Sequence, residues 1–256
     1  MICTVFIMEQ EGLLKKPRTQ GRIYVAKYYP GRAMPKTADD TVTNILIHSS
    51  DKGIGGPLSP YHLRDESGNL LENIWQFAKV YPSVTKQRIP LGKYHPNTIV
   101  WEHDAELHVD PLTNQVLPAY WEWRRKGTSN KYAVRYPNGY QGRHKCAFSI
   151  WNGDRLDYIE ARKRIYCGEY IRLAPKTASF QEIKSYVEAG RSIQIVEVDG
   201  PDPTLTYPPY DKISKEEPGM LMDEETIRLL INDPKKPFGH GFVIAALLLD
   251  GQDWLR

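Results

Sequence analysis

The sequence is poor in cysteine, with only Cys3, Cys146 and Cys167 among 256 residues. These three form no close pair and no Cys-x-x-Cys motif. A small secreted protein that depends on disulfides carries an even and much denser set. The pattern therefore excludes that class and indicates reduced thiols inside the cell.

Long apolar runs are also missing. The longest, residues 242–249, is far shorter than the roughly 20 residues that a helix needs to cross a bilayer. The apolar start at residues 2–8 lacks the basic flank of a signal peptide and is typical of a first β-strand. We therefore expect no membrane partner and a cytoplasmic or nuclear location.

Neither sign of charge dominates, because the formal net charge is +3. Total charge therefore does not indicate a nucleic-acid-binding protein. The hydrophobic share of 41% and the charged share of 25% are ordinary for globular proteins, and 16 Tyr and 6 Trp disfavour disorder. No repeat, low-complexity tract or clear linker divides the chain. The sequence predicts a single α+β domain.

Strands and helices are both expected along the chain. Runs rich in β-branched and aromatic residues predict strands at 2–8, 22–29, 43–47, 98–101, 132–136, 146–151 and 192–198. Helical periodicity predicts helices at 69–81, 155–173, 179–189, 223–232 and 242–255, with Ser179 as the N-cap of the third. The Pro-rich stretch 201–220 is expected to be a mobile loop.

The helix expected at 69–81 carries a polar stripe. Five apolar residues cover most of its circumference: Leu71, Ile74, Trp75, Phe77 and Ala78. Glu72, Gln76 and Lys79 follow one another at i, i+4 and i+7 and so share one face. One interpretation is an ordinary solvated edge. The other is a pocket in which a carboxylate, an amide and an ammonium hold a phosphorylated sugar and stabilise positive charge at its anomeric carbon.

Several segments around this helix follow a recognisable order. They are Ile47-His48-Ser49-Ser50, Gly56-Pro57-Leu58-Ser59-Pro60-Tyr61, Asp65-Glu66-Ser67-Gly68, the Glu-x-x-x-Gln-x-x-Lys pattern of Glu72, Gln76 and Lys79, Ile195-Val196-Glu197 with Asp202, and Gly239-His240-Gly241. In these features the chain resembles the NADAR family (NAD- and ADP-ribose-associated domain). Members of that family cleave N-glycosidic bonds of ribosylated compounds.

The resemblance implies a largely helical core of about residues 43–92 and 155–255, N-terminal strands in 1–42 and an insert at about 93–154. It also implies an N-glycosidase, without a cofactor, that acts on an ADP-ribosylated or phosphoribosylated nucleobase or nucleotide derivative.

The same resemblance implies roles for single residues. Glu72 and Asp202 match the acidic positions that stabilise a sugar cation and activate water. Lys79 either binds a phosphate or acts as a nucleophilic amine. The implied substrate-binding residues are Ser50, Ser59, Tyr61, Gln76, Glu197, His240 and Gly241. Glu197 is alternatively a third acidic group or a solvent-facing strand residue. The Gly-His-Gly segment either offers backbone N–H groups to an anion or is simply a tight turn before a buried helix.

Some positions depart from the family pattern. Pro60 stands where Asn is usual, Asn73 stands where His is common, and no Trp-Gly follows Asp202. These departures leave open a non-catalytic relative that binds ADP-ribose or a similar nucleotide.

The insert suggests a further alternative. It contains Tyr120-Trp121-Glu122-Trp123-Arg124-Arg125-Lys126, in which three aromatic residues are followed by three cations. A nucleic-acid-binding or nucleic-acid-modifying protein would use Trp121, Trp123, Arg124, Arg125 and Lys126 for stacking and phosphate contacts. The structural alternative packs the Trp residues inward. The histidines and Cys146 of this region match no zinc template, so no metal is expected.

Overall fold

The computed structural model describes residues 20–48, 52–84, 87–90, 100–103, 105–134, 145–214, 216, 219–249 and 254, with the backbone alone at 87–90 and 100–103. The strand expected at 2–8, Ser50 and most of the last helix beyond residue 249 lie outside these residues. In the described part of the chain, no helix is long and apolar enough to cross a membrane.

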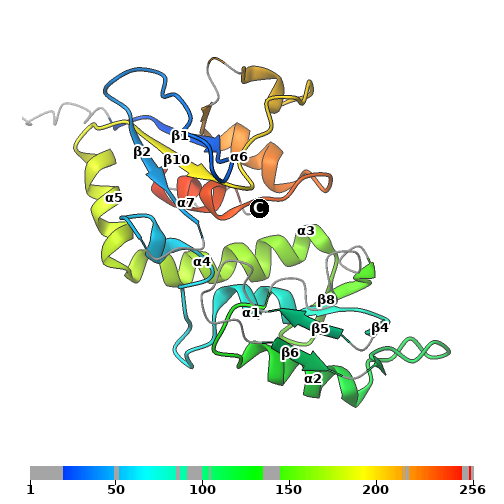
Figure 1. The fold of residues 1–256 in the computed structure, drawn as a ribbon. Helices are drawn as coiled ribbons and strands as arrows, with labels where there is room; N and C mark the ends of the chain where they lie inside the picture. The colour runs from blue at the N-terminus through cyan, green and yellow to red at the C-terminus, as the bar shows by residue number, and fades with distance from the viewer. Residues whose placement is uncertain are drawn as a thin grey trace, which may run out of the picture.

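A four-stranded sheet forms one half of the molecule (Figure 1). Its strands, in spatial order, are β11 (Met220–Leu221), β1 (Ile23–Lys27), β10 (Ile193–Glu197) and β2 (Thr43–Leu46). β1 and β2 run parallel to β10, whereas β11 is antiparallel to β1. The strands expected at 22–29, 43–47 and 192–198 are confirmed. All of β10 is buried, as is usual for a central parallel strand.

Three helices accompany this sheet: α5 (Ala178–Glu188), α6 (Glu224–Ile231) and α7 (His240–Leu248). Helix α7 packs against β1 and β10, and almost all of its side chains are buried. The N-cap of α5 is not Ser179, as expected, but lies two residues earlier. The cap is Thr177, whose hydroxyl accepts a hydrogen bond from Phe180 N at 3.1 Å.

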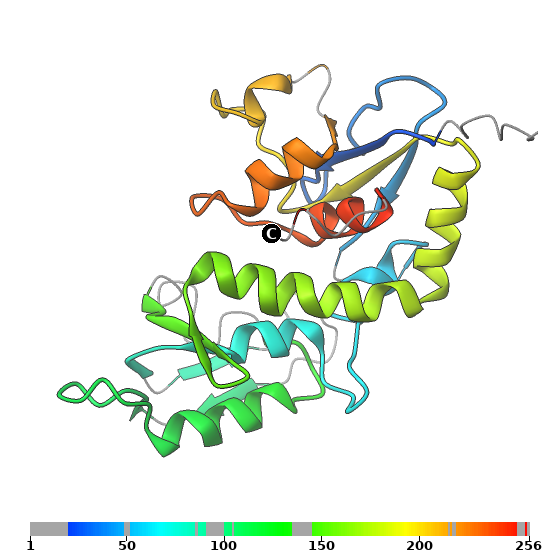
Figure 2. The same cartoon turned by 180° about the vertical axis from the view of Figure 1, so that it is seen from behind.

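A long helix lies between the two halves of the molecule in both views (Figures 1 and 2). It consists of α3 (Tyr158–Ala161), the π-helical segment η3 (Arg162–Cys167) and α4 (Gly168–Leu173). Asp157 caps its start by accepting a hydrogen bond from Glu160 N at 2.8 Å. The helix expected at 155–173 is confirmed except for its first residues, which belong to strand β9 (Asp154–Leu156).

The other half is built from α1, α2 and short antiparallel strands. The elements are α1 (Leu71–Phe77), β3 (Lys79–Val80), β4 (Ser83–Val84), β5 (Gln87–Pro90), β6 (Val100–His103), β7 (Glu106–Leu107), α2 (Pro118–Thr128) and β8 (Phe148–Trp151). Strands β3, β8 and β9 form one sheet, and β4 pairs with β7 and β5 with β6. The strand expected at 146–151 is confirmed, but residues 132–134 form no strand. Helix α2 was not predicted.

A separate apolar cluster holds this half together. Its buried members are Phe77, Val80, Tyr81, Val84, Val109, Tyr120, Trp123, Val134 and Ile150. The hydroxyl of Tyr120 donates to the carbonyl oxygen of Ala78 at 3.1 Å. Gly127 lies so close to α1 that an added Cβ would be 1.9 Å from the ring of Phe77. The insert is therefore packed against the end of α1.

The N-terminal strand β1 is part of the core, because it lies inside the sheet beside β10. The core combines this mixed sheet with several helices. Within the expected loop 201–220, Tyr210 and Ile213 are buried in the main core. The α+β class itself is confirmed.

Candidate active site

The parallel strands β1, β10 and β2 end at one edge of the sheet, where α/β proteins commonly bind ligands. Tyr28 follows β1 and His48 lies just after β2. Their rings stack with centroids 6.2 Å apart. The N–H of Tyr28 donates to the carbonyl oxygen of Glu197, the last residue of β10, at 2.6 Å. The edge therefore brings together aromatic, imidazole and carboxylate groups from three strands.

Glu197 lies at the N-terminus of α7 and is completely buried. A Cβ on Gly239 would lie 2.4 Å from its Oε2, and one on Gly241 would lie 2.8 Å from its Oε1. Glycine is therefore required at both positions. The N–H groups of Gly241 and Phe242 point towards the carboxylate without completing hydrogen bonds of ordinary geometry. The anion that suits the Gly-His-Gly segment is thus the protein's own Glu197.

The groups around Glu197 shift its pKa in opposite directions. Burial raises the pKa of Glu197, and nearby Asp199 adds to that effect. The His240 ring and the two N–H groups of α7 act in the opposite direction. His240 Nδ1 is 3.5 Å from Glu197 Oε2, and its Nε2 is 3.0 Å from the carbonyl oxygen of Ile47. Burial, followed by the nearby imidazoles of His240 and His62, lowers the pKa of His48. His240 thus connects Glu197 to the end of β2.

Two tyrosines of the long helix lie between Glu197 and α1. Tyr166 belongs to η3 and Tyr170 to α4, and their ring centroids are 5.1 Å apart. Burial raises the pKa of both hydroxyls well above the ordinary value, and the charges of Glu197 and Glu72 raise them further. Both tyrosines therefore lie in the field of the same two carboxylates. π-Helical segments such as η3 occur frequently at functional sites.

Glu72, Gln76 and Lys79 form a connected chain of hydrogen bonds. Gln76 Nε2 donates to Glu72 Oε1 at 2.9 Å, and Lys79 Nζ donates to Gln76 Oε1 at 2.7 Å. Glu72 and Gln76 are buried. The expected helical stripe is correct only for these two residues, because α1 ends at Phe77 and Lys79 lies in β3. Its long side chain still reaches the amide.

Trp75 joins this chain to the tyrosines. Lys79 Nζ lies over its ring, 4.6 Å from the centroid, and the Tyr166 ring is 5.5 Å away on a tilted plane. Trp75, Lys79 and His48 are each only partly buried, as are Tyr61 and His62. These five side chains are partly exposed, whereas Glu72 and Glu197 are buried.

Ser59 and Tyr61 support the cluster from the segment before α1. Ser59 is fully buried, and its Oγ accepts a long hydrogen bond of 3.4 Å from Tyr61 N. The carbonyl oxygen of Pro60 accepts the N–H of Glu72 at 3.0 Å. This backbone bond fixes the start of α1 beside the turn.

Asp202 is engaged elsewhere. Its Oδ1 accepts from the N–H and hydroxyl of Thr204 at 3.0 and 2.7 Å, and these bonds lower its pKa. Its Oδ2 lies 3.7 Å from Lys236 Nζ. The partners of Asp202 are thus Thr204 and Lys236, whereas Asp199 contributes to the field around Glu197 and Tyr166.

The proposed nucleic-acid contacts on α2 do not form one surface. Trp123 is buried against Phe77, Tyr120 and His108 and cannot stack with a base, which corrects that expectation. Trp121 is 47% exposed. Arg125 and Lys126 are exposed, and both pair with Glu122, at 2.8 and 3.3 Å. Arg124 instead points inwards to the carbonyl oxygen of Ile150.

The described residues contain no group of three or more His, Cys, Asp or Glu side chains arranged to hold a metal ion. Two surface pockets, of about 380 and 320 Å³, are lined by Trp151 and neighbouring residues, and neither is lined by Glu72 or Glu197. Comparison with protein-family models, with curated proteins and with solved structures finds no match to this chain.

Sequence reasoning missed Tyr166, Tyr170 and Asp199. The two tyrosines are four residues apart and so share one helix face, a spacing that is also typical of an ordinary core. Asp199 belongs to the turn after β10, just beyond the strand expected at 192–198. A polar group just beyond a buried parallel strand was the one signal that could have identified it.

Proposed function

We propose that this chain hydrolyses the N-glycosidic bond of an ADP-ribosylated or phosphoribosylated nucleobase or nucleotide derivative. The observation that carries the proposal is the buried Glu72 carboxylate, which accepts a hydrogen bond from the Gln76 amide while that amide accepts one from Lys79. A carboxylate oriented by an amide and shielded from water suits the stabilisation of a sugar cation.

The reaction requires two complementary groups. As the bond between C1 of the ribose and the base nitrogen breaks, positive charge develops on the sugar and the leaving nitrogen needs a proton. Burial raises the pKa of Glu197, which favours its protonated form and suits a proton donor. Glu72 then supports the cation, and water adds to C1 with loss of its proton to a carboxylate. Glu72 and Glu197 share this work, with Asp199 as a further acceptor.

Lys79 fits phosphate binding better than nucleophilic attack. Its Nζ donates to Gln76 and lies over the face of Trp75, and both contacts favour the ammonium form. Its partly buried position lets the ammonium meet a phosphate while Trp75 contacts a ring. In this proposal Ser59 and Gln76 act by positioning Glu72.

The test is a panel of candidate substrates. The wild-type protein is incubated with ADP-ribosylated guanosine, ADP-ribosylated DNA and RNA oligonucleotides and small ribosyl-phosphate amines, and released sugar is measured by mass spectrometry. Glu72→Gln tests the site, and Glu122→Gln, an exposed glutamate on α2, is the matched control. Release by the wild type and the control, but not by Glu72→Gln, supports the proposal. Tight binding of ADP-ribose with no release by the folded wild type would refute hydrolysis and indicate a non-catalytic binder.

A further inference from the structure

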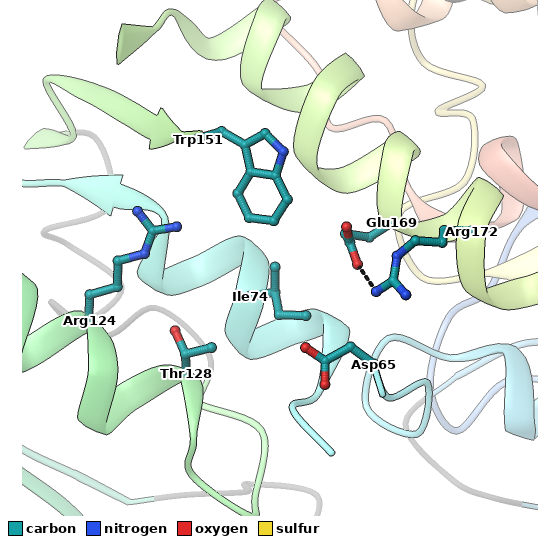
Figure 3. Close-up of a pocket in the computed structure, with 7 residues that line it drawn as sticks. All are labelled: Asp65, Ile74, Arg124, Thr128, Trp151, Glu169 and Arg172. Atoms are coloured by element: carbon teal, nitrogen blue, oxygen red, sulfur yellow. Dashed lines mark hydrogen bonds and ion pairs between the residues drawn. The ribbon is translucent and has the colours of Figure 1, made fainter. Parts of the chain in front are cut away.

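A pocket of about 380 Å³ lies beside α1, on the side that carries Ile74 (Figure 3). Its lining residues are Asp65, Ile74, Arg124, Thr128, Trp151, Glu169 and Arg172. Ile74 is two residues after Glu72, which places the two side chains about 200° apart around the helix. The volume lies in the range of small-molecule sites. This pocket is therefore separate from the candidate active site.

Arg124 supplies a fixed cation on one wall. Its Nη1 donates to the carbonyl oxygen of Ile150 at 3.0 Å and lies 3.4 Å from the hydroxyl of Tyr120. Among the described residues, no carboxylate forms an ion pair with Arg124, in contrast to Arg125 on the same helix. A guanidinium has five N–H donors in one plane and suits the oxygens of a phosphate. Thr128, one turn further along α2, adds a hydroxyl to this wall.

The opposite wall carries acceptors. Glu169 pairs with Arg172 at 2.6 Å (Figure 3). Arg172 also pairs with Glu66. Asp65 Oδ1 accepts the N–H groups of Ser67 and Asn69 at 3.0 and 2.7 Å, and its Oδ2 accepts the side-chain amide of Asn69 at 2.9 Å. Each carboxylate oxygen has two lone pairs, so both groups retain capacity for another N–H donor. This wall suits an amino group on a ligand.

The space between the two walls has apolar surfaces. The indole of Trp151 stands above the pocket and Ile74 lies between the walls (Figure 3). Trp151 is only partly buried, so part of its ring is available for contact. A flat aromatic surface binds a planar ring by stacking.

We propose that this pocket binds a planar heteroaromatic ring that has an amino group at one end and a phosphate at the other, the chemistry of a nucleoside monophosphate. The phosphate meets Arg124 and Thr128, the ring stacks on Trp151, and the amino group meets Asp65 and Glu169. Binding in this pocket does not depend on hydrolysis at Glu72.

Isothermal titration with AMP tests this site, with adenosine and inorganic phosphate as separate probes. We expect AMP to bind more tightly than either fragment. Arg124→Gln should weaken AMP binding by more than about tenfold because a charge-assisted contact is lost, whereas Arg125→Gln should leave it unchanged. Thr128→Val, which leaves the contacts of Arg124 in place, should weaken it by about fivefold.

Three results would overturn the proposal. The first is no AMP binding by the wild type at millimolar concentration. The second is an equal effect of the two arginine variants. The third is loss of AMP binding in Glu72→Gln, because that would locate the nucleotide at the candidate active site. Unchanged AMP binding in Glu72→Gln supports a separate pocket whether or not the proposed hydrolysis is found.

Discussion

Replacement of Arg162 tests how the segment that carries Tyr166 is held in place. Arg162 belongs to η3 and is only 2% exposed. Its guanidinium donates to four backbone carbonyl oxygens at and beyond the end of α6: Leu230 at 3.2 Å, Ile231 at 2.9 Å, Asp233 at 2.9 Å and Lys236 at 2.7 Å. It also lies over the ring of Tyr158, 4.6 Å from the centroid. One side chain therefore binds the long helix to the end of α6.

The magnitude follows from these contacts. A hydrogen bond to a charged group contributes about 1.5–3 kcal/mol, but four such bonds do not add fully because water can reach some of the released carbonyls. Each buried carbonyl oxygen that is left without its donor costs about 1–3 kcal/mol. We therefore expect Arg162→Met, which keeps the length of the side chain without its donors, to lower the free energy of unfolding by about 3–5 kcal/mol.

Urea denaturation followed by circular dichroism measures this loss. Arg164→Met is the matched control, because Arg164 lies on the same segment but is exposed and pairs only with Asp154 at 2.7 Å. It should cost less than about 1 kcal/mol. Equal losses in the two variants, or a loss below about 1 kcal/mol for Arg162→Met, would refute the reasoning.

Three further predictions concern single positions, and urea denaturation checks each of them. Gly127→Ala should lower the free energy of unfolding by about 1–3 kcal/mol because its Cβ meets the ring of Phe77. Gly168→Ala, the control, should raise it by up to about 1 kcal/mol, since its Cβ would lie near a single backbone oxygen at 3.7 Å. Thr177→Ala should lower the free energy of unfolding by about 1 kcal/mol because the N-cap of α5 is lost, and Ser179→Ala should lower it much less. Equal losses in the two variants would refute the assignment of Thr177 as the cap. Burial raises the pKa of Glu197, so the folded state keeps this proton to a higher pH than the unfolded chain, and stability falls as pH rises through that interval. Glu197→Gln should therefore stabilise the protein more at about pH 7 than at about pH 4, and the opposite order would contradict the raised pKa.

The sequence predicted three of the four strands of the main sheet and most helices because their patterns are local. Strands β1, β2 and β10 are short runs of β-branched residues between turn signals, and the long helix has clear periodicity. Helix α2 was missed because its core-facing residues are aromatic and lie among exposed cations, so its composition resembled a binding surface. The inward position of Trp123 depends on contacts with Phe77 and His108, which no local pattern reveals.

The candidate site was predictable only in part. The chain from Glu72 to Lys79 was visible as a spacing, although the end of α1 at Phe77 was not. The proximity of Glu197 to the N-terminus of α7 depends on parallel pairing of β10 with both neighbours, which brings together residues far apart in the chain. A local sequence pattern does not reveal which strands pair.

The rate of sugar release in a single turnover tests the central claim most directly, with enzyme in excess over an ADP-ribosylated substrate identified by the panel. Loss of a preorganised charge at a developing cation should slow this step by at least about 100-fold in Glu72→Gln. Glu122→Gln should match the wild type. Equal rates for all three proteins would contradict catalysis at Glu72.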